Sequence, residues 1–537
     1  MDTEIFDAIV VGSGAAGGWA AKELTERGLR IVLLEAGRSI DPDVDFPETP
    51  PEQTSRVQLL SRVRAVMRGQ AIQARCMSFS PLTQHLFVND RQNPYRTATG
   101  HPFNWYRGRQ TGGRLHLWGR NALRISDLDL KPASIDGFGD DWPLSYADLE
   151  PWYTRVEGFL GVHGSAAGIL NLPDGHYDRP HVITNAERAL LGTLKTKWSN
   201  RPATTSRIVR HNPRRVPLPI LAALATGRLE LRSDAVASHI TIDPATATAR
   251  GVVYVDRRTK DAREVRGKVV VLCASTVESV RILLNSSSRQ HPAGLGNSSG
   301  TLGRYLTDHP MVFQAGPFSP IEGGVKEDAY DFGAQTGIYI PSFRNVGRRS
   351  EANFIRGYSL LGSVARIEPG WFVIGTGEML PRYENRVEID ESRRDAWGIP
   401  TVRITCAHSD NEHAMVQDMK AAIAQLAHEC GLEANVLGRE SLVNRLVYRL
   451  AGRLVFTPSG ALVPGSAVHE AGGARMGVDP KTSVLNRFNQ CWDAGNVFVT
   501  DSASFTTSPF QNPGLTIMAL SARAAAYIAE QMRRGDL

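Results

Sequence analysis

The feature that most constrains the fold is a glycine-rich turn near the start of the chain. Residues 7–11 read DAIVV, a β-branched run typical of a buried parallel strand, and Gly12, Gly14 and Gly17 follow it directly. The composition of residues 19–27 then favours a helix. A strand, a glycine turn and a helix in this order predict a Rossmann-like dinucleotide-binding unit, and therefore an α/β fold.

The three glycines of this turn have separate physical roles. Gly12 permits the tight turn, Gly14 lets the backbone approach a pyrophosphate, and Gly17 lets the helix pack on the strand. The amino end of the helix presents N–H donors and partial positive charge to phosphates, and Ala15 and Ala16 lie in the turn that leads to it. We therefore expect all five residues to contribute to a phosphate site.

An acidic residue follows the next expected strand, residues 30–34. Glu35, with Ala36 beside it, lies where a carboxylate would accept hydrogen bonds from ribose hydroxyls. A carboxylate at this position disfavours a phosphate on the ribose and hence NADP. The unit by itself leaves both NAD and FAD open.

The composition of the chain excludes several other classes of protein. Its 537 residues are enough for two joined domains, and 42% apolar with 22% charged residues is typical of folded proteins. No run of about eighteen uncharged apolar residues occurs, so we expect no transmembrane segment. The first six residues include two acids and no basic start, so we expect no signal peptide.

The net charge and the cysteine content restrict the partners, the metal sites and the compartment that we expect for this chain. The net charge of +6 comes from arginines spread along the chain without a recognition motif, so we expect no nucleic-acid partner. The cysteines lack CxxC spacing, which predicts neither a disulfide framework nor a metal site and favours a cytoplasmic protein. They are Cys76, Cys273, Cys406, Cys430 and Cys491.

The carboxyl-terminal tail distinguishes FAD from NAD. Residues 469–477 read HEAGGARMG and residues 496–528 read NVFVTDSASFTTSPFQNPGLTIMALSARAAAYI, which closely resembles the terminal signature of the GMC (glucose-methanol-choline) oxidoreductase family. Residues 109–113, 269–284 and 302–309 extend the resemblance. The family binds FAD and oxidises alcohols, so the resemblance implies an FAD-dependent enzyme that acts on CH–OH groups.

The resemblance also implies a Rossmann-like FAD-binding domain and a discontinuous α+β substrate domain with a mixed or antiparallel sheet over the flavin. We expect the FAD-binding domain to comprise residues 1–40, 103–145, 228–311 and 465–537. The substrate-binding domain would comprise residues 41–102, 146–227 and 312–464. Its strands are expected at residues 338–341, 359–367, 371–380, 386–389 and 401–406, with a helix at 411–430.

Further flavin contacts are implied along the chain. The turn at Gly112 and Gly113 would approach the flavin. Some family members attach FAD through a histidine four residues after the second glycine; Leu117 takes that position here, so we expect noncovalent FAD. His116 is either a flavin contact or a hydrogen-bonded packing residue. The other expected contacts are Arg109, Thr111, Trp118, Asn121, Val236, Ala274, Ser275, Asp501, Asn512, Pro513 and Thr516.

The catalytic pair implied by the resemblance is His469 and Asn512. Oxidation of an alcohol requires a base beside the hydroxyl, which His469 supplies, while Asn512 cannot titrate and would hold the substrate oxygen. Glu470 is expected to pair with an arginine such as Arg475. The histidine–asparagine combination resembles the sugar-oxidising branch of the family, which includes pyranose oxidases, glucoside 3-dehydrogenases and flavoproteins of gluconate-type dehydrogenases.

We therefore expect a dehydrogenase that oxidises a hydroxyl of a sugar, glycoside or aminoglycoside-like molecule by hydride transfer to flavin N5. Two alternatives stay open: an oxidase that uses oxygen, and a lyase that uses the same fold without redox chemistry. The motifs leave oxygen, a quinone and a redox protein equally open as the electron acceptor.

Overall fold

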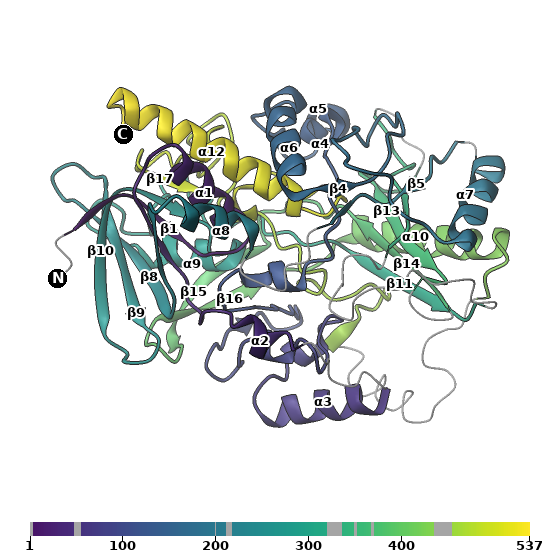
Figure 1. The fold of residues 1–537 in the computed structure, drawn as a ribbon, viewed down its shortest axis with the longest axis horizontal. Helices are drawn as coiled ribbons and strands as arrows, with labels where there is room; N and C mark the ends of the chain where they lie inside the picture. Colours follow the sequence, from purple (N-terminus) through teal and green to yellow (C-terminus); the bar gives the residue numbers. More distant parts are fainter. Residues whose placement is uncertain are drawn as a thin grey trace.

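The computed structural model describes residues 4–47, 55–198, 200–210, 217–318, 336–347, 352–366, 370–433 and 454–537. Two large sheets lie toward opposite ends of an elongated molecule (Figure 1). The expected strand at 359–367 ends at Ile367, which lies outside the described residues.

The first sheet is mostly parallel and has the order β7-β2-β1-β10-β9-β8, with β17 beside β10. Pairing from β7 through β10 to β17 is parallel, whereas β9 and β8 are antiparallel. Its strands are β1 (Ile5–Val11), β2 (Ile31–Leu34), β7 (Leu229–Arg232), β8 (Ala235–Ile242), β9 (Ala249–Asp256), β10 (Ala262–Leu272) and β17 (Val497–Val499).

Helices cover both faces of this sheet. Alternate residues of β1 point in opposite directions: Ala8 and Val10 pack under α1 (Ala15–Glu26), α8 (Leu218–Ala225) and α12 (Gly514–Arg534), seen above the sheet in Figure 1. Ile9 and Val11 pack with α9 (Thr276–Asn285). Burial on both faces explains why the central strands read as continuous apolar runs.

The second sheet is antiparallel, with the order β11-β14-β13-β12-β5. Its strands are β5 (Thr204–Thr205), β11 (Met311–Gly316), β12 (Ile338–Ile340), β13 (Tyr358–Val364) and β14 (Trp371–Gly377). The helices α7 (Asn185–Lys197) and α10 (Asp410–Glu429) pack on one face. Ser409 and Glu412 form a capping box that starts α10.

The strands expected at 386–389 and 401–406 are present, but they do not join the second sheet. They form a separate sheet of β15 (Arg386–Arg394), β16 (Pro400–Thr405) and β3 (Arg96–Thr97). Buried Arg281 of α9 pairs with Asp395 at 2.8 Å and donates to the Pro400 carbonyl at 2.8 Å. These contacts hold the small sheet against α9, beside the parallel sheet.

Shorter elements and connections complete the described chain. They are α2 (Pro42–Asp45), α3 (Ser55–Met67), α4 (Asp127–Leu130), α5 (Pro132–Asp136), α6 (Tyr146–Leu160), β4 (Val162–His163), β6 (Ile208–Val209), and the 3₁₀ turns η1 (Gln73–Arg75), η2 (Gln84–Leu86), η3 (Gly113–Leu117) and η5 (Ser502–Ser504). None of the helices in the described part of the chain is both long and apolar enough to span a membrane.

Candidate active site

A long cavity lies between the carboxyl ends of the parallel strands and the inner face of the second sheet. The glycine turn after β1, the end of β2 and the start of α12 form one side of it. Leu361 of β13 and Phe372 and Ile374 of β14 line the other side. Ligands of doubly wound sheets bind outside the carboxyl ends of their strands, so this cavity is the candidate site.

Two glycines of the first turn, Gly12 and Gly17, are required by packing, whereas Gly14 borders the cavity. Gly12 has φ +97°, and a Cβ there would lie 2.5 Å from the Cys273 carbonyl oxygen. A Cβ on Gly17 would lie 1.7 Å from the Gly12 carbonyl oxygen. A Cβ on Gly14 would meet no protein atom within 4 Å, so the space beside Gly14 is left for a ligand.

The amino end of α1 is left free to bind an anion. Gly14 occupies the N-cap position and provides no side-chain cap, and the first turn of the helix carries no acidic residue. Its first N–H groups therefore have no side-chain acceptor in the described structure and point their partial positive charge toward the cavity.

Glu35 is held at the end of β2 in the wall of the cavity. Its carboxylate accepts hydrogen bonds from the Ser13 backbone N–H at 3.1 Å, from the Ser13 hydroxyl, and from the Gly37 N–H at 2.8 Å. Burial raises the pKa of Glu35 above its usual value, while these hydrogen bonds favour the charged form. The contacts fix the carboxylate beside the glycine turn.

His469 and Asn512 meet at one wall of the cavity, as the sequence predicts. Asn512 Nδ2 lies 3.4 Å from His469 Nε2, immediately before the first turn of α12. On its other side, His469 Nδ1 lies 3.1 Å from Nδ1 of His309, whose Nε2 lies 3.1 Å from the Ser508 hydroxyl oxygen.

The contacts around His469 define one arrangement of its hydrogen. The Asn512 amide nitrogen is a donor, so Nε2 of His469 accepts and Nδ1 carries the hydrogen. His469 Nδ1 then donates to His309 Nδ1, and His309 Nε2 donates to Ser508. The basic lone pair of His469 is therefore on the atom next to Asn512.

Both histidines are neutral at neutral pH. Burial, followed by the neighbouring His309 and Arg114, lowers the pKa of His469 well below its usual value. Burial lowers the pKa of His309 to about 4. A neutral imidazole beside the cavity is able to accept a proton from a bound hydroxyl group.

Asp308 holds the loop that carries His469. Its carboxylate accepts backbone N–H groups of Gly465 at 2.6 Å, Ala467 at 3.2 Å and His469 at 3.1 Å. Burial and then the charge of Glu470 raise the pKa of Asp308 to about 7. Sequence reasoning did not single out Asp308 or His309, although both lie in the 302–309 segment that extends the family resemblance.

Glu470 pairs with an arginine, as expected, but the partner is Arg114 and not Arg475. Glu470 pairs with Arg114 at 2.8 Å, and Arg114 also donates to Ser275 at 2.8 Å. Arg475 instead pairs with Asp140 at 2.7 Å. The two side chains diverge because Gly472 and Gly473, both with positive φ, turn the chain between them.

Most of the expected cofactor residues line the cavity. They are Gly12, Gly14, Ala15, Ala16, Glu35, Ala36, Arg109, Gly113, Trp118, Asn121, Val236, Ala274, Ser275, Asp501, Asn512 and Pro513, together with His469 and Leu117. Arg109 pairs with Glu278 at 2.7 Å, another cavity residue. Burial alone would raise the pKa of Glu278, but nearby arginines, Arg109 first among them, hold it at about 2.

Five expected contacts do not line the cavity: Gly17, Thr111, Gly112, His116 and Thr516. His116 Nε2 lies 2.7 Å from the Thr111 carbonyl oxygen and its ring packs at 5.6 Å from that of Phe46, so it occupies the packing role. The Thr516 hydroxyl instead contacts the Tyr153 hydroxyl at 2.9 Å.

Several cavity residues were not expected from the sequence. They include Ser13, Cys76, Met77, Ser78, Arg114, Met311, Phe372, Ile374 and Ser502. The alternation of residues 371–374 predicts a strand with two faces, but only the packed sheet shows that Phe372 and Ile374 face the cavity.

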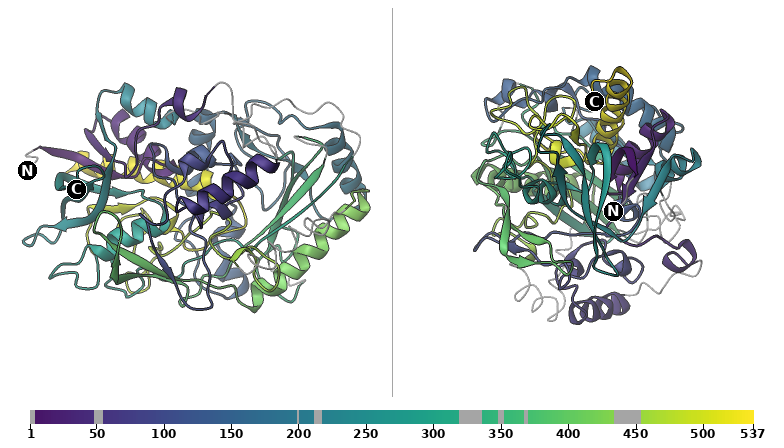
Figure 2. Two further views of the ribbon diagram at one scale, coloured as in Figure 1. Left: turned by 90° about the horizontal axis from the view of Figure 1, so that it is seen from below. Right: turned by 90° about the vertical axis from the view of Figure 1, so that its left-hand side faces the viewer.

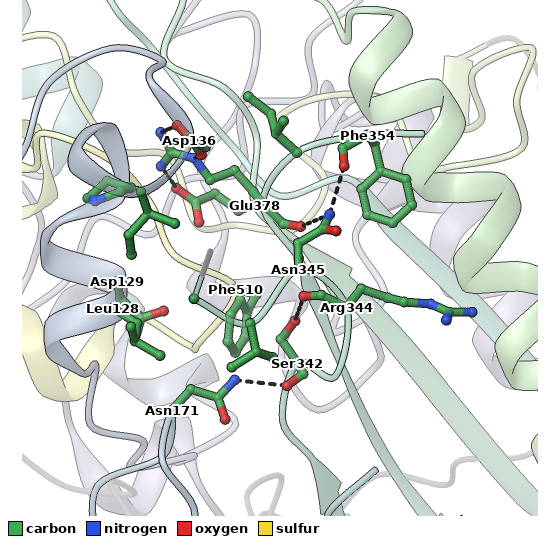
Figure 3. A pocket seen from close by; sticks show the side chains of 17 residues that line it. Leu128, Asp129, Asp136, Asn171, Ser342, Arg344, Asn345, Phe354, Glu378 and Phe510 are labelled. Carbon is green, nitrogen blue, oxygen red and sulfur yellow. Dashed lines mark hydrogen bonds and ion pairs between the residues drawn. The ribbon is translucent and has the colours of Figure 1, made fainter. Parts of the chain in front are cut away.

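Figure 3 shows a second cavity, one of whose lining residues, Phe510, lies near the carboxyl-terminal helix in sequence. Asp129, Asp136, Glu378 and Phe510 line it, and none of its lining residues within the described chain lines the first cavity. Burial raises the pKa of Asp129 to about 6 and that of Glu378 to about 7. Gln511 donates to Asp129 at 3.1 Å, which ties this acidic cluster to the residue before Asn512.

The residues of the first cavity fit FAD. The open space at Gly14, the free N–H groups of α1 and the held carboxylate of Glu35 match a pyrophosphate and a ribose. The same cavity continues to His469 and Asn512, where a reacting ring would lie.

Family models match three segments of the chain. Residues 219–311 and 381–521 match models described as GMC oxidoreductase, and residues 7–43 match a model described as FAD binding domain. The fold agrees with that of a solved relative: pyridoxine 4-oxidase from Mesorbium loti is 17% identical with a TM-score of 0.63, over 98% of this chain and 99% of that one.

Curated relatives align over nearly the whole chain. The 2-methyl-1,2-propanediol dehydrogenase of Mycolicibacterium austroafricanum is 26% identical over 98% of this chain and 95% of its own length. The fructose dehydrogenase large subunit of Gluconobacter japonicus is 25% identical over 98% of both. Paromamine 6'-oxidase of Streptomyces fradiae is 24% identical over 100% of this chain and 92% of its own length. The chain therefore belongs to the GMC oxidoreductase family and is an FAD-dependent oxidoreductase.

Proposed function

We propose that this enzyme oxidises a hydroxyl group of a sugar, glycoside or aminoglycoside-like molecule to a carbonyl. The observation that carries the proposal is the pairing of His469 Nε2 with Asn512 Nδ2, 3.4 Å apart at the wall of the FAD cavity. Support for the substrate class comes from relatives named for fructose, for paromamine and for a vicinal diol.

In this proposal His469 and Asn512 act on the same substrate oxygen. His469 Nε2 accepts the hydroxyl proton, and the Asn512 amide donates a hydrogen bond to that oxygen as negative charge develops on it. Bound FAD supplies the acceptor for the hydride that leaves the substrate carbon. His309 maintains the tautomer of His469 and is a positioning residue, because it lies behind the ring.

The cavity residues support assignments for the remainder of the cofactor. We assign the pyrophosphate to Gly12, Gly14, Ala15 and Ala16, and a ribose to Glu35. The other expected residues that line the cavity would contact the rest of FAD. Gly17, Gly112 and His116 support these contacts through packing, because their neighbours are protein atoms. We also propose that residues 1–40, 103–145, 228–311 and 465–537 form the FAD-binding domain.

We favour a dehydrogenase over an oxidase. We also propose that the enzyme is cytoplasmic. The first two relatives named above are dehydrogenases. All five cysteines are free thiols, which supports a reducing compartment.

An anaerobic screen of sugars, glycosides and polyols tests the proposal. A substrate should bleach the flavin absorbance without oxygen, and the product should carry one new carbonyl group. The absence of bleaching by every polyol, with FAD fully bound, would overturn the substrate class. Turnover that leaves the flavin oxidised would indicate the lyase alternative.

The same substrate then distinguishes dehydrogenase from oxidase. Turnover is measured in air, with and without an artificial two-electron acceptor, and peroxide is quantified. A dehydrogenase should need the acceptor and form little peroxide. Peroxide in a one-to-one ratio with product would establish the oxidase alternative.

A further inference from the structure

The helix α3 carries an apolar stripe that faces solvent. Five apolar residues of α3 are exposed, namely Leu59 (53%), Leu60 (43%), Val63 (49%), Val66 (48%) and Met67 (65%). At 100° per residue they fall within an arc of about 120°. An apolar stripe of this width normally packs against the core, so its exposure calls for a partner.

The opposite face of α3 attaches the helix to the protein through small and polar groups. Ser61 and Ala65 are buried, and the Ser61 hydroxyl donates to Gln84 at 3.0 Å. Arg62 donates to the backbone carbonyls of Cys76 at 3.2 Å and Phe79 at 2.8 Å. These polar contacts orient the helix with its apolar stripe outward.

Positively charged side chains lie beside the stripe. Arg56, Arg64 and Arg68 are exposed and form no ion pair with any residue in the described part of the chain. No aspartate or glutamate occurs between Ser55 and Asn89. The stripe is therefore complementary to a surface that is both apolar and negatively charged.

The position of α3 suits a broad, flat partner. The helix lies at the lower edge of the molecule in Figure 1, and the right-hand view of Figure 2 again places it at the periphery. A flat partner surface contacts only those parts of a protein that protrude, such as a helix at its edge. The Arg62 side chain donates a hydrogen bond to the Cys76 carbonyl, and Cys76 lines the FAD cavity. A partner surface on α3 would therefore lie beside the wall of that cavity.

We propose that α3 docks this enzyme on an anionic lipid surface, with the five apolar residues in the interface and the three arginines at the headgroups. Basic helices with an aliphatic face bind the boundary between headgroups and acyl chains in this way. Lipid is favoured over a protein partner because the stripe consists only of Leu, Val and Met, without an aromatic anchor or a hydrogen-bonding group.

Co-sedimentation of the full-length enzyme, with FAD bound and no substrate, tests the proposal. Vesicles contain phosphatidylcholine alone, or have about a third of it replaced by phosphatidylglycerol. The enzyme should sediment with the anionic vesicles and stay in solution with the neutral ones. Raising the salt from about 0.05 to about 0.5 M should release much of it, because screening weakens the arginine contacts.

Two variants with a matched control locate the contact. Val63→Ser with Met67→Ser should weaken vesicle binding at least about tenfold, since it removes buried apolar area. Leu221→Ser with Leu224→Ser alters two leucines of α8 with exposures of 43% and 39% and should bind like the wild type. Flavin absorbance and the unfolding temperature verify that each variant is folded.

The outcomes are decisive in both directions. Wild-type enzyme that stays in solution with both vesicles overturns the proposal, as does equal binding by the α3 and α8 variants. If size-exclusion chromatography shows that only the α3 variant loses a dimer and no protein binds vesicles, α3 is a contact between copies and the proposal is wrong. Because no turnover is involved, the result is independent of which alcohol the enzyme oxidises.

Discussion

His469 and His309 face each other through their Nδ1 atoms at 3.1 Å, with their rings nearly perpendicular. A contact between two ring nitrogens requires one donor and one acceptor. Because Asn512 donates to the far nitrogen of His469, the hydrogen between the rings belongs to His469. This contact therefore links His309, which lies behind the site, to the basicity of His469 Nε2, which lies inside it.

Replacing His469 by Ala should nearly abolish flavin reduction while FAD stays bound. The side chain is the proposed base, and a positioned general base contributes about a hundredfold or more. Stopped-flow measurement of anaerobic flavin bleaching gives the rate, and the absorbance of bound flavin gives the occupancy. A rate within a few fold of wild type would refute the role of His469.

His309→Leu and His309→Asn should differ in activity. Asn places an acceptor oxygen where Nδ1 of His309 lies, so it preserves the tautomer of His469, whereas Leu removes the acceptor. We expect His309→Leu to lower the rate of flavin reduction at least about tenfold with little change in KM, and Asn to restore most of it. Equal rates for the two variants, both with full FAD content, would show that His309 only fills space.

The rate of flavin reduction should stay level from pH 8 down to the usual pKa of a histidine and fall only at lower pH. Burial lowers the pKa of His469, so its neutral form persists below that value. The unfolded chain binds a proton at this histidine first, so folding stability should also decline as the pH falls below about 6.5. A rate that already halves near pH 7 would contradict a neutral, buried His469.

Two glycines of the first turn should respond differently to substitution. Gly14→Val should lower FAD occupancy with little change in the unfolding temperature of the FAD-free chain, because its side chain fills ligand space. Gly17→Val should destabilise the fold itself by about 1–3 kcal/mol or more, because its Cβ overlaps the Gly12 carbonyl oxygen. Flavin absorbance and thermal unfolding distinguish the two effects; equal FAD loss with equal unfolding temperatures would contradict this division.

The FAD should be released by acid precipitation. Leu117 lines the cavity and offers no nucleophile, and His116 is held away from it by the Thr111 carbonyl. After precipitation the yellow colour should therefore be found in the supernatant. Flavin that stays with the pellet, and a peptide mass increased by that of FAD, would show a covalent link.

Local patterns predicted the elements that build the flavin end of the site. The strand, the turn at Gly12 and the helix are short-range features, since glycine positions and apolar period depend on neighbours in the chain. β1 ends at Val11, as expected, whereas α1 begins at Ala15, four residues before the expected start of the helix at Trp19. The tail motif likewise predicted that His469 and Asn512 act together, and they lie 3.4 Å apart.

Other features depended on where distant segments meet. The period-two pattern of β15 and β16 predicted strands but not their sheet, because strand pairing depends on segments distant in the chain: β16 pairs with β3, and Arg281 of α9 pairs with Asp395. No helix was predicted from the sequence at residues 55–67, and polar contacts on one face of α3 orient its apolar face outward.

The sequence by itself determined a dinucleotide unit, because a glycine turn specifies backbone geometry locally, and the resemblance of its tail to the GMC family implied a flavin enzyme and its candidate base. Only the tertiary structure decided that His309, 160 residues away, orients that base. Nothing in the local pattern around His309 specifies this contact, since it forms where two rigid segments close on each other. The same holds for the ion pair of Glu470 with Arg114, which lie 356 residues apart.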